Sequence, residues 1–154
     1  MPRLTRSLAL AALLVLPGLA QARPVTFTTT LSQYGGRGAY LAVYVLDAQG
    51  AYVGTASLSG TKSKYWRHLS DWARTGGSIL GQIDGVTGAS VGPGQSLTVT
   101  VDLADAMIDA GYEVHIDAAV EDFRESPSEV VLPLIAAGAS GAGRGFVTSF
   151  SYDM

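Results

Sequence analysis

The segment DGVTGAS, Asp84 to Ser90, has a composition suited to covalent modification. Ser90 offers a hydroxyl, and Gly88 and Ala89 leave its surroundings uncrowded. Thr87 and Asp84 add polar groups on its N-terminal side. A segment of this kind fits into the active site of another enzyme. Glycine and proline are also dense around it, which predicts an exposed, pliable connection and leaves a plain turn as the alternative.

An aromatic and basic segment, residues 62–75, precedes this motif. Its apolar residues recur at helical spacing, which predicts a helix or a pair of helical turns. The apolar side carries Tyr65, Leu69 and Trp72, with Trp66 and Ala73 beside them. The opposite side carries Lys62, Lys64, Arg67 and Arg74. Trp66 and Trp72 are candidates for stacking on a flat ligand, although large aromatic residues of small domains more often cover a core. In that case the basic residues form an ordinary solvated face.

Other chemically useful residues are few. His115 and Asp117 lie two positions apart in a predicted strand and share a face, which suits two ligands of a metal site, but the sequence identifies no third ligand. Cysteine is absent, which excludes disulfides, thiolate metal sites, iron–sulfur clusters and CxxCH haem attachment. No GxSxG, HExxH or Walker motif is present, so we expect a redox or binding protein and not a stand-alone enzyme.

The N-terminus has the pattern of a secretory signal peptide. Arg3 and Arg6 precede an apolar stretch that ends in the small residues of AQA, 20–22. We therefore predict a signal peptide over residues 1–22 and one periplasmic or otherwise exported domain over 23–154, which has 132 residues. The apolar stretch is too short to cross a membrane, so we expect no direct membrane insertion. The exported part has a net charge of −5, which argues against nucleic acid as a partner.

From Pro24 onward, short alternating segments are separated by turn residues. Alternation is clearest over 96–103, where apolar residues alternate with Thr98, Thr100 and Asp102. Strands are predicted over 25–31, 39–47, 51–59, 96–103, 111–120, 128–135 and 145–154, with a hairpin turn at 47–50 and a helical turn within 104–111. The fold class is therefore mainly β: a single-domain antiparallel immunoglobulin-like β-sandwich with one short helical segment.

The motif resembles the D-x-x-[ST]-G-A-[ST] sequence of extracytosolic proteins that carry FMN in phosphoester linkage. In those proteins an FAD:protein FMN transferase of ApbE type attaches FMN to the last serine or threonine, more often a threonine. The resemblance implies that Ser90 is the acceptor. It also implies that Asp84, Thr87, Gly88 and Ala89 are recognition residues.

A second resemblance extends over most of the exported part. A strand pair followed by KYWRHLSDWART and then DGVTGAS is similar to a family of predicted periplasmic proteins of unknown function, DUF2271. The family pattern K-Y-x-x-x-L-x-x-W falls here on Lys64, Tyr65, Leu69 and Trp72. The resemblance implies a β-sandwich, and the family's association with flavin-transfer and membrane redox genes implies electron transfer. VDLADAMIDAG stands where relatives often have a W-D-G-x-D-D-x-G turn.

Together these observations predict an extracytosolic electron carrier with covalent FMN on Ser90, working between a membrane or periplasmic redox protein and another exported protein. The basic residues of segment 62–75 are expected near the phosphodiester, and the flavin ring on Trp66, Trp72 or Tyr65. An unmodified immunoglobulin-like binding module that contacts a protein partner is the alternative. A metal-binding accessory protein that uses His115 and Asp117 is a third reading.

Overall fold

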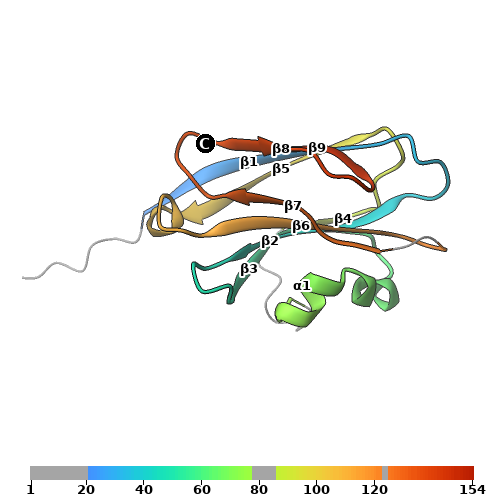
Figure 1. Ribbon diagram of the computed structural model, residues 1–154, viewed down its shortest axis with the longest axis horizontal. Helices are drawn as coiled ribbons and strands as arrows, with labels where there is room; N and C mark the ends of the chain where they lie inside the picture. Colours follow the sequence, from blue (N-terminus) through green and yellow to red (C-terminus); the bar gives the residue numbers. More distant parts are fainter. Residues whose placement is uncertain (1–20, 78–85, 123–124) are drawn as a thin grey trace, which may run out of the picture.

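A computed structural model describes residues 21–77, 86–122 and 125–154 of the protein. Nearly all of the predicted signal peptide therefore lies outside the described residues. The described chain forms two sheets packed face to face, with a short helical segment beneath one of them (Figure 1). The predicted single-domain β-sandwich is confirmed. Within the described ranges, no helix has the length and apolar character needed to span a membrane.

The four-stranded sheet has the order β5-β1-β9-β8. Its strands are β1 (Ala22–Leu31), β5 (Ser96–Ala104), β8 (Ala139–Gly141) and β9 (Val147–Asp153). All of its neighbouring strands run antiparallel. The helical turn expected within 104–111 is present as η3 (Asp105–Met107), which follows β5 directly.

The five-stranded sheet has the order β4-β3-β2-β6-β7. Its strands are β2 (Ala39–Leu46), β3 (Tyr52–Ser59), β4 (Val86–Gly88), β6 (Glu113–Val120) and β7 (Glu125–Pro133). Four of them pair antiparallel, and β4 pairs with β3 in parallel. The prediction of a purely antiparallel sandwich is therefore corrected at this edge, where the chain returns to β3 after the helical segment instead of directly.

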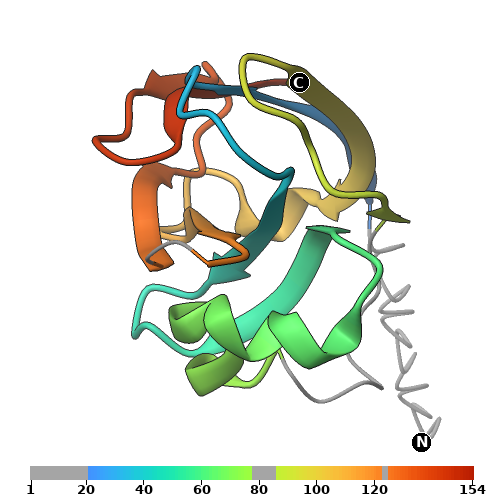
Figure 2. The ribbon, with the colours of Figure 1, turned by 90° about the vertical axis from the view of Figure 1, so that its right-hand side faces the viewer.

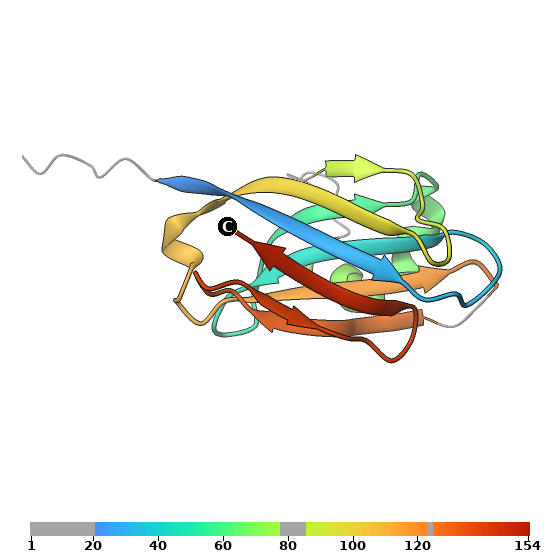
Figure 3. The same ribbon diagram turned by 90° about the horizontal axis from the view of Figure 1, so that it is seen from above.

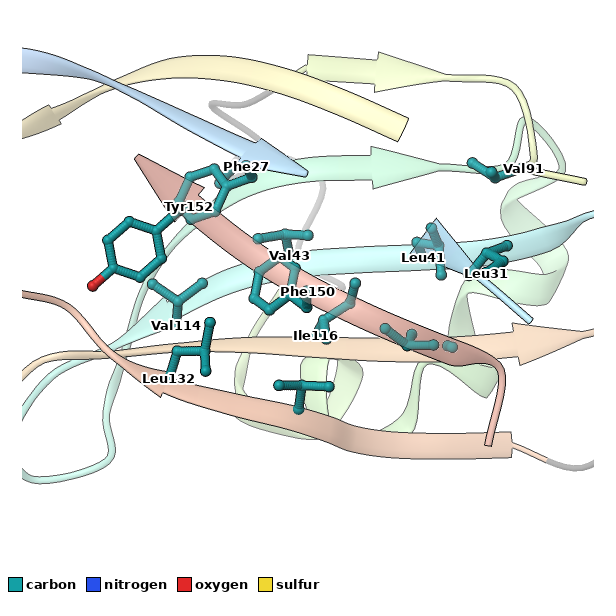
Figure 4. Close-up of a cluster of buried hydrophobic side chains, with 14 of the residues drawn as sticks. Phe27, Leu31, Leu41, Val43, Val91, Val114, Ile116, Leu132, Phe150 and Tyr152 are labelled. Atoms are coloured by element: carbon teal, nitrogen blue, oxygen red, sulfur yellow. The ribbon is translucent and has the colours of Figure 1, made fainter. Parts of the chain in front are cut away.

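The main core fills the space between the sheets (Figure 4). Because side chains alternate across a strand, every second residue of β1, β2 and β6 points into it. Its largest members are Phe27, Leu31, Leu41, Ile116, Phe150 and Tyr152. The alternation predicted for the strand over 145–154 is interrupted: Thr148 is exposed, and the β1–β9 register shifts at Thr30 and Leu31.

A second apolar cluster covers the opposite, outer face of the five-stranded sheet. There η1 (Ser63–His68) and α1 (Ser70–Thr75) lie across the sheet (Figure 2) and bury Leu69 and Trp72 against Tyr44 and Leu58. This confirms the predicted pair of helical turns. It also explains why β2 is apolar at every position, since one set of its side chains faces the main core and the other faces the helical cover.

Candidate functional site

The backbone of the motif is part of the five-stranded sheet and not a free turn. Val86–Gly88 forms the edge strand β4 beside β3 (Figure 3), and the amide of Gly60 donates to the Gly88 carbonyl at 2.8 Å. Three residues later, Val91 and Ala39 exchange two backbone hydrogen bonds of 2.6 and 3.0 Å. The chain from Val86 to Val91 therefore pairs first with β3, runs past the end of that strand and then pairs with β2 at Ala39. The prediction of a pliable connection is corrected for these residues.

The side chains of the motif are open to solvent. Thr87, Gly88, Ala89 and Ser90 are all exposed, whereas Asp84 lies outside the described residues. A methyl group on Gly88 would meet no atom within 4 Å, so the space on that side is free. The predicted acceptor and three of its four predicted recognition residues thus share one exposed strip at a fixed sheet edge.

Ser90 lies on the outer face of the sheet, the face that also carries the helical cover. Its neighbour Val91 points into the main core, at the same end as Leu31 and Leu41 (Figure 4), so Ser90 points the other way. A methyl group on Gly38 would lie 2.7 Å from Oγ of Ser90. The serine hydroxyl thus lies directly over a glycine of the loop that enters β2.

Two cations share one carboxylate near this end of the sheet. Arg37, which precedes Gly38, donates to Glu121 at 2.6 Å, and Lys62 lies 3.6 Å from the other oxygen of the same carboxylate. Both cationic side chains are more than half exposed (67 % and 57 %), whereas that of Glu121 is only 10 % exposed. Arg37 and Lys62 are therefore held at Glu121, and each has donors left over for an anion.

The four basic residues predicted to serve a phosphate do not act as one group. Lys62 has the position just described. The other three contact residues of the helical segment itself: Lys64 lies over the Tyr65 ring at 4.8 Å, Arg67 contacts His68, and Arg74 pairs with Asp71. Arg37 was missed in the sequence, because one arginine in a glycine-rich loop gives no periodic signal.

The two tryptophans have different roles. Trp72 is fully buried (0 % exposed) and its Nε1 donates to the Thr55 hydroxyl at 2.8 Å, so its predicted stacking on a flavin is wrong. Trp66 is half-buried, packs edge-on against Trp72 and donates from Nε1 to the Gly60 carbonyl at 2.8 Å. The Gly60 amide donates to the Gly88 carbonyl, so Gly60 is hydrogen-bonded both to Trp66 and to the motif.

His115 and Asp117 belong to a buried polar network. Asp117, which has no exposed surface, accepts from the Trp72 amide (2.8 Å), the Ser128 amide (2.7 Å) and the Tyr44 hydroxyl (3.0 Å). His115 contacts the Ser128 hydroxyl at 3.1 Å through Nδ1. Among the residues that the structure describes, no three histidine, aspartate or glutamate side chains group as metal ligands.

Protonation in this network follows from burial and hydrogen bonding. Burial raises the pKa of Asp117, although its three donors act in the opposite direction. Burial also raises the pKa of Tyr44, which therefore remains a donor. For Asp71, burial alone would raise the pKa, but hydrogen bonds from Ser128 and Arg74 outweigh it and lower the pKa. The network fixes α1 to β6 and β7, which is a structural task.

The residues of the strip fit a phosphoester better than they fit catalysis. An exposed hydroxyl can be acylated or phosphorylated by another enzyme, and the guanidinium of Arg37 and the ammonium of Lys62 match a phosphodiester charge. The open side at Gly88 leaves room for a bulky group. On these grounds the strip is compatible with FMN held through phosphate at Ser90.

Comparison with known proteins adds the family. The model of the family described as predicted periplasmic protein (DUF2271) matches residues 22–149. No curated protein and no solved structure matches the chain. The match covers most of the sequence, and the chain therefore belongs to this predicted periplasmic family.

Proposed function

We propose that this member of a periplasmic family carries FMN covalently on Ser90 and serves as an electron carrier outside the cytoplasm. The observation that carries the proposal is the presentation of one hydroxyl. Ser90 is exposed, yet the backbone on either side of it is fixed, at Gly88 by Gly60 and at Val91 by Ala39. An exposed hydroxyl on a fixed backbone is suited to recognition by a modifying enzyme.

Attachment requires a transferase and FAD as the FMN donor. Oγ of Ser90 forms a bond to the flavin-side phosphorus of FAD while the bond from that phosphorus to the AMP oxygen breaks. AMP leaves with the proton of the serine hydroxyl, and the protein gains the mass of FMN less one water. No oxidation or reduction takes place in this step.

The chain's own residues then hold the attached group in place. Arg37 and Lys62 supply positive charge beside the phosphodiester, and Glu121 keeps both cations in position. The bound flavin supplies reversible electron transfer, which the side chains of this cysteine-free protein do not offer. A covalent link prevents loss of the cofactor from an exported protein. The redox partners are a membrane or periplasmic donor and a second exported protein.

The test is the intact mass of the exported protein after co-production with an ApbE-type FMN transferase. We expect a gain of one FMN less water in the wild type and in Ser90→Thr, which keeps a hydroxyl. Ser90→Ala should show no gain, and Ser96→Ala, which alters another exposed serine, should behave as the wild type. An unshifted wild-type mass, with the transferase proven active on a different substrate, overturns the proposal. That result favours the unmodified binding module.

A further inference from the structure

A pocket of about 300 Å³ lies between η1 and the C-terminal end of β6. This volume is at the lower end of the range of small-molecule sites, which is roughly 300–1,000 Å³. Tyr40 and Ala119, which belong to the outer apolar cluster, line it on the sheet side, and Tyr65 and His68 line it on the η1 side. Glu121 and two further acidic residues of the β6–β7 region also line the pocket.

The lining suits a flat aromatic ring with a polar edge. The Tyr40 and Tyr65 rings pack at 5.5 Å with an interplanar angle of 58°. Tyr65 is half-buried and lines the pocket, and Lys64 lies over its ring at 4.8 Å from an exposed position. Carboxylates accept from an imide N–H, and Glu125 is held by His68 at 2.6 Å.

The pocket and Ser90 lie at the same end of the five-stranded sheet. Val91 pairs with Ala39, and Ala39 pairs with Val120, so the two outer residues are two strand spacings apart, roughly 10 Å. Because both pairings are antiparallel, Ser90 falls at the level of Tyr40 and Ala119, and Glu121 falls at the level of Gly38. Arg37, which precedes Gly38, is bound to Glu121.

The two sites also share a face. Ala39 points into the main core and Tyr40 into the outer cluster. By alternation Gly38 lies on the side of Tyr40, and the Ser90 hydroxyl is directly over Gly38. A group tethered at Ser90 thus reaches the pocket along the outer surface without crossing the sheet, over a length that a ribityl phosphate can span.

We infer that this pocket is the seat of the isoalloxazine ring of FMN tethered at Ser90, with Tyr65 as the stacking residue. The inference rests on the proposed function and adds the place where the ring binds. Arg37 and Lys62 contact Glu121, which lines the pocket, and their remaining donors serve the phosphate. The carboxylates of Glu121 and Glu125 accept from the ring N–H. Trp66 does not line the pocket.

The experiment uses the full exported protein loaded by the transferase, with intact mass and flavin fluorescence measured on the same samples. Tyrosine stacking quenches flavin emission, so the loaded wild type should emit weakly. Unfolding it in urea, with the flavin still attached, should raise the emission at least about fivefold. Tyr65→Leu should raise it at least about threefold in the folded protein, since stacking worth about 1 kcal/mol changes the bound-to-free ratio about fivefold.

Two controls separate the outcomes. Tyr112→Leu changes another half-buried tyrosine, at the opposite end of β6, and should leave the emission unchanged. A His68→Ala/Glu125→Gln double variant, at two partly exposed positions, should raise emission without loss of folding. A full mass gain with emission equal to free FMN, unaltered by urea and by these variants, overturns the seat alone. The absence of any mass gain overturns the proposed function and the seat with it.

Discussion

Gly60→Ala is expected to damage both the fold and the motif, because Gly60 connects three parts of the site. Its φ is +109°, in the left-handed region that disfavours a side chain, and a methyl group there would lie 1.9 Å from Cδ1 of Tyr40. Its amide binds the Gly88 carbonyl and its carbonyl binds Trp66, both at 2.8 Å. Because both the amide and the carbonyl of Gly60 are hydrogen-bonded, a shift of its backbone away from Tyr40 would break at least one of these bonds.

The size of the effect follows from two contributions. A non-glycine residue in a disfavoured backbone region costs about 1–3 kcal/mol. Forcing an extra methyl into a packed site costs a further 1–3 kcal/mol, approximately. Gly60→Ala should therefore lower the free energy of unfolding by about 2–6 kcal/mol, a large part of the roughly 5–15 kcal/mol typical of a domain.

The chain provides matched controls. Gly50 has φ +81° with no atom within 4 Å of an added methyl, so Gly50→Ala isolates the backbone contribution at about 1 kcal/mol. Gly54 has free space and no positive φ, so Gly54→Ala should leave stability unchanged or slightly higher.

Urea unfolding followed by tryptophan fluorescence measures all three variants, since Trp66 and Trp72 are the only two tryptophans. Loading by the transferase should also fall in Gly60→Ala but not in the controls. A loss for Gly60→Ala no larger than that for Gly50→Ala would refute the argument from the Tyr40 contact.

Further predictions concern the buried network and the acceptor. Asp117→Ala should lower the free energy of unfolding by at least about 3 kcal/mol, because three donors lose their acceptor at roughly 1–3 kcal/mol each; a thermal melt that moves by only a degree or two would contradict this. Folding raises the pKa of Asp117, so the folded state holds the proton of this carboxyl more tightly than the unfolded state does. The stability advantage of wild type over Asp117→Ala should therefore shrink as pH rises above about 4 toward the raised pKa. Urea titrations from pH 3.5 to 7, in approximate steps of half a unit, test the sign of this change. Gly38→Ala should slow FMN attachment, since the methyl would lie 2.7 Å from the Ser90 hydroxyl, while stability changes by less than about 1 kcal/mol; an unchanged time course of mass gain would contradict the placement of that hydroxyl.

Alternation and helical spacing predicted most of the fold because they reflect burial, which is local in sequence. In β5 only one face is covered, so apolar and polar residues alternate. In β2 both faces are covered, so every residue is apolar. The strand β4 could not be predicted in this way. It has only three residues, Val86–Gly88. Its parallel partner β3 precedes the helical segment in the sequence, and β4 follows it. Pairing over that separation leaves no periodic pattern in so short a stretch.

The candidate site was predictable in part for the same reason. The acceptor motif is contiguous, so Ser90 and three neighbours were identified together. Trp66 and Trp72 occupy the same helical segment, and spacing alone does not rank their burial; the hydrogen bond of Trp72 to Thr55 and the edge contact with Trp66 decide it. Arg37 pairs with Glu121, which directly follows β6 and is distant in the sequence, so no local pattern indicates the pair.

The two anchors of the motif have a consequence for the order of events in the cell. Gly60 follows β3 and Ala39 begins β2, so the acceptor acquires its fixed shape only after both strands have assembled. A transferase that recognises this shape would pass over chains that have not finished folding, and would not need to pull an extended peptide out of the sheet. Under the proposed function, only chains whose two sheets have already assembled would receive the cofactor and take part in electron transfer.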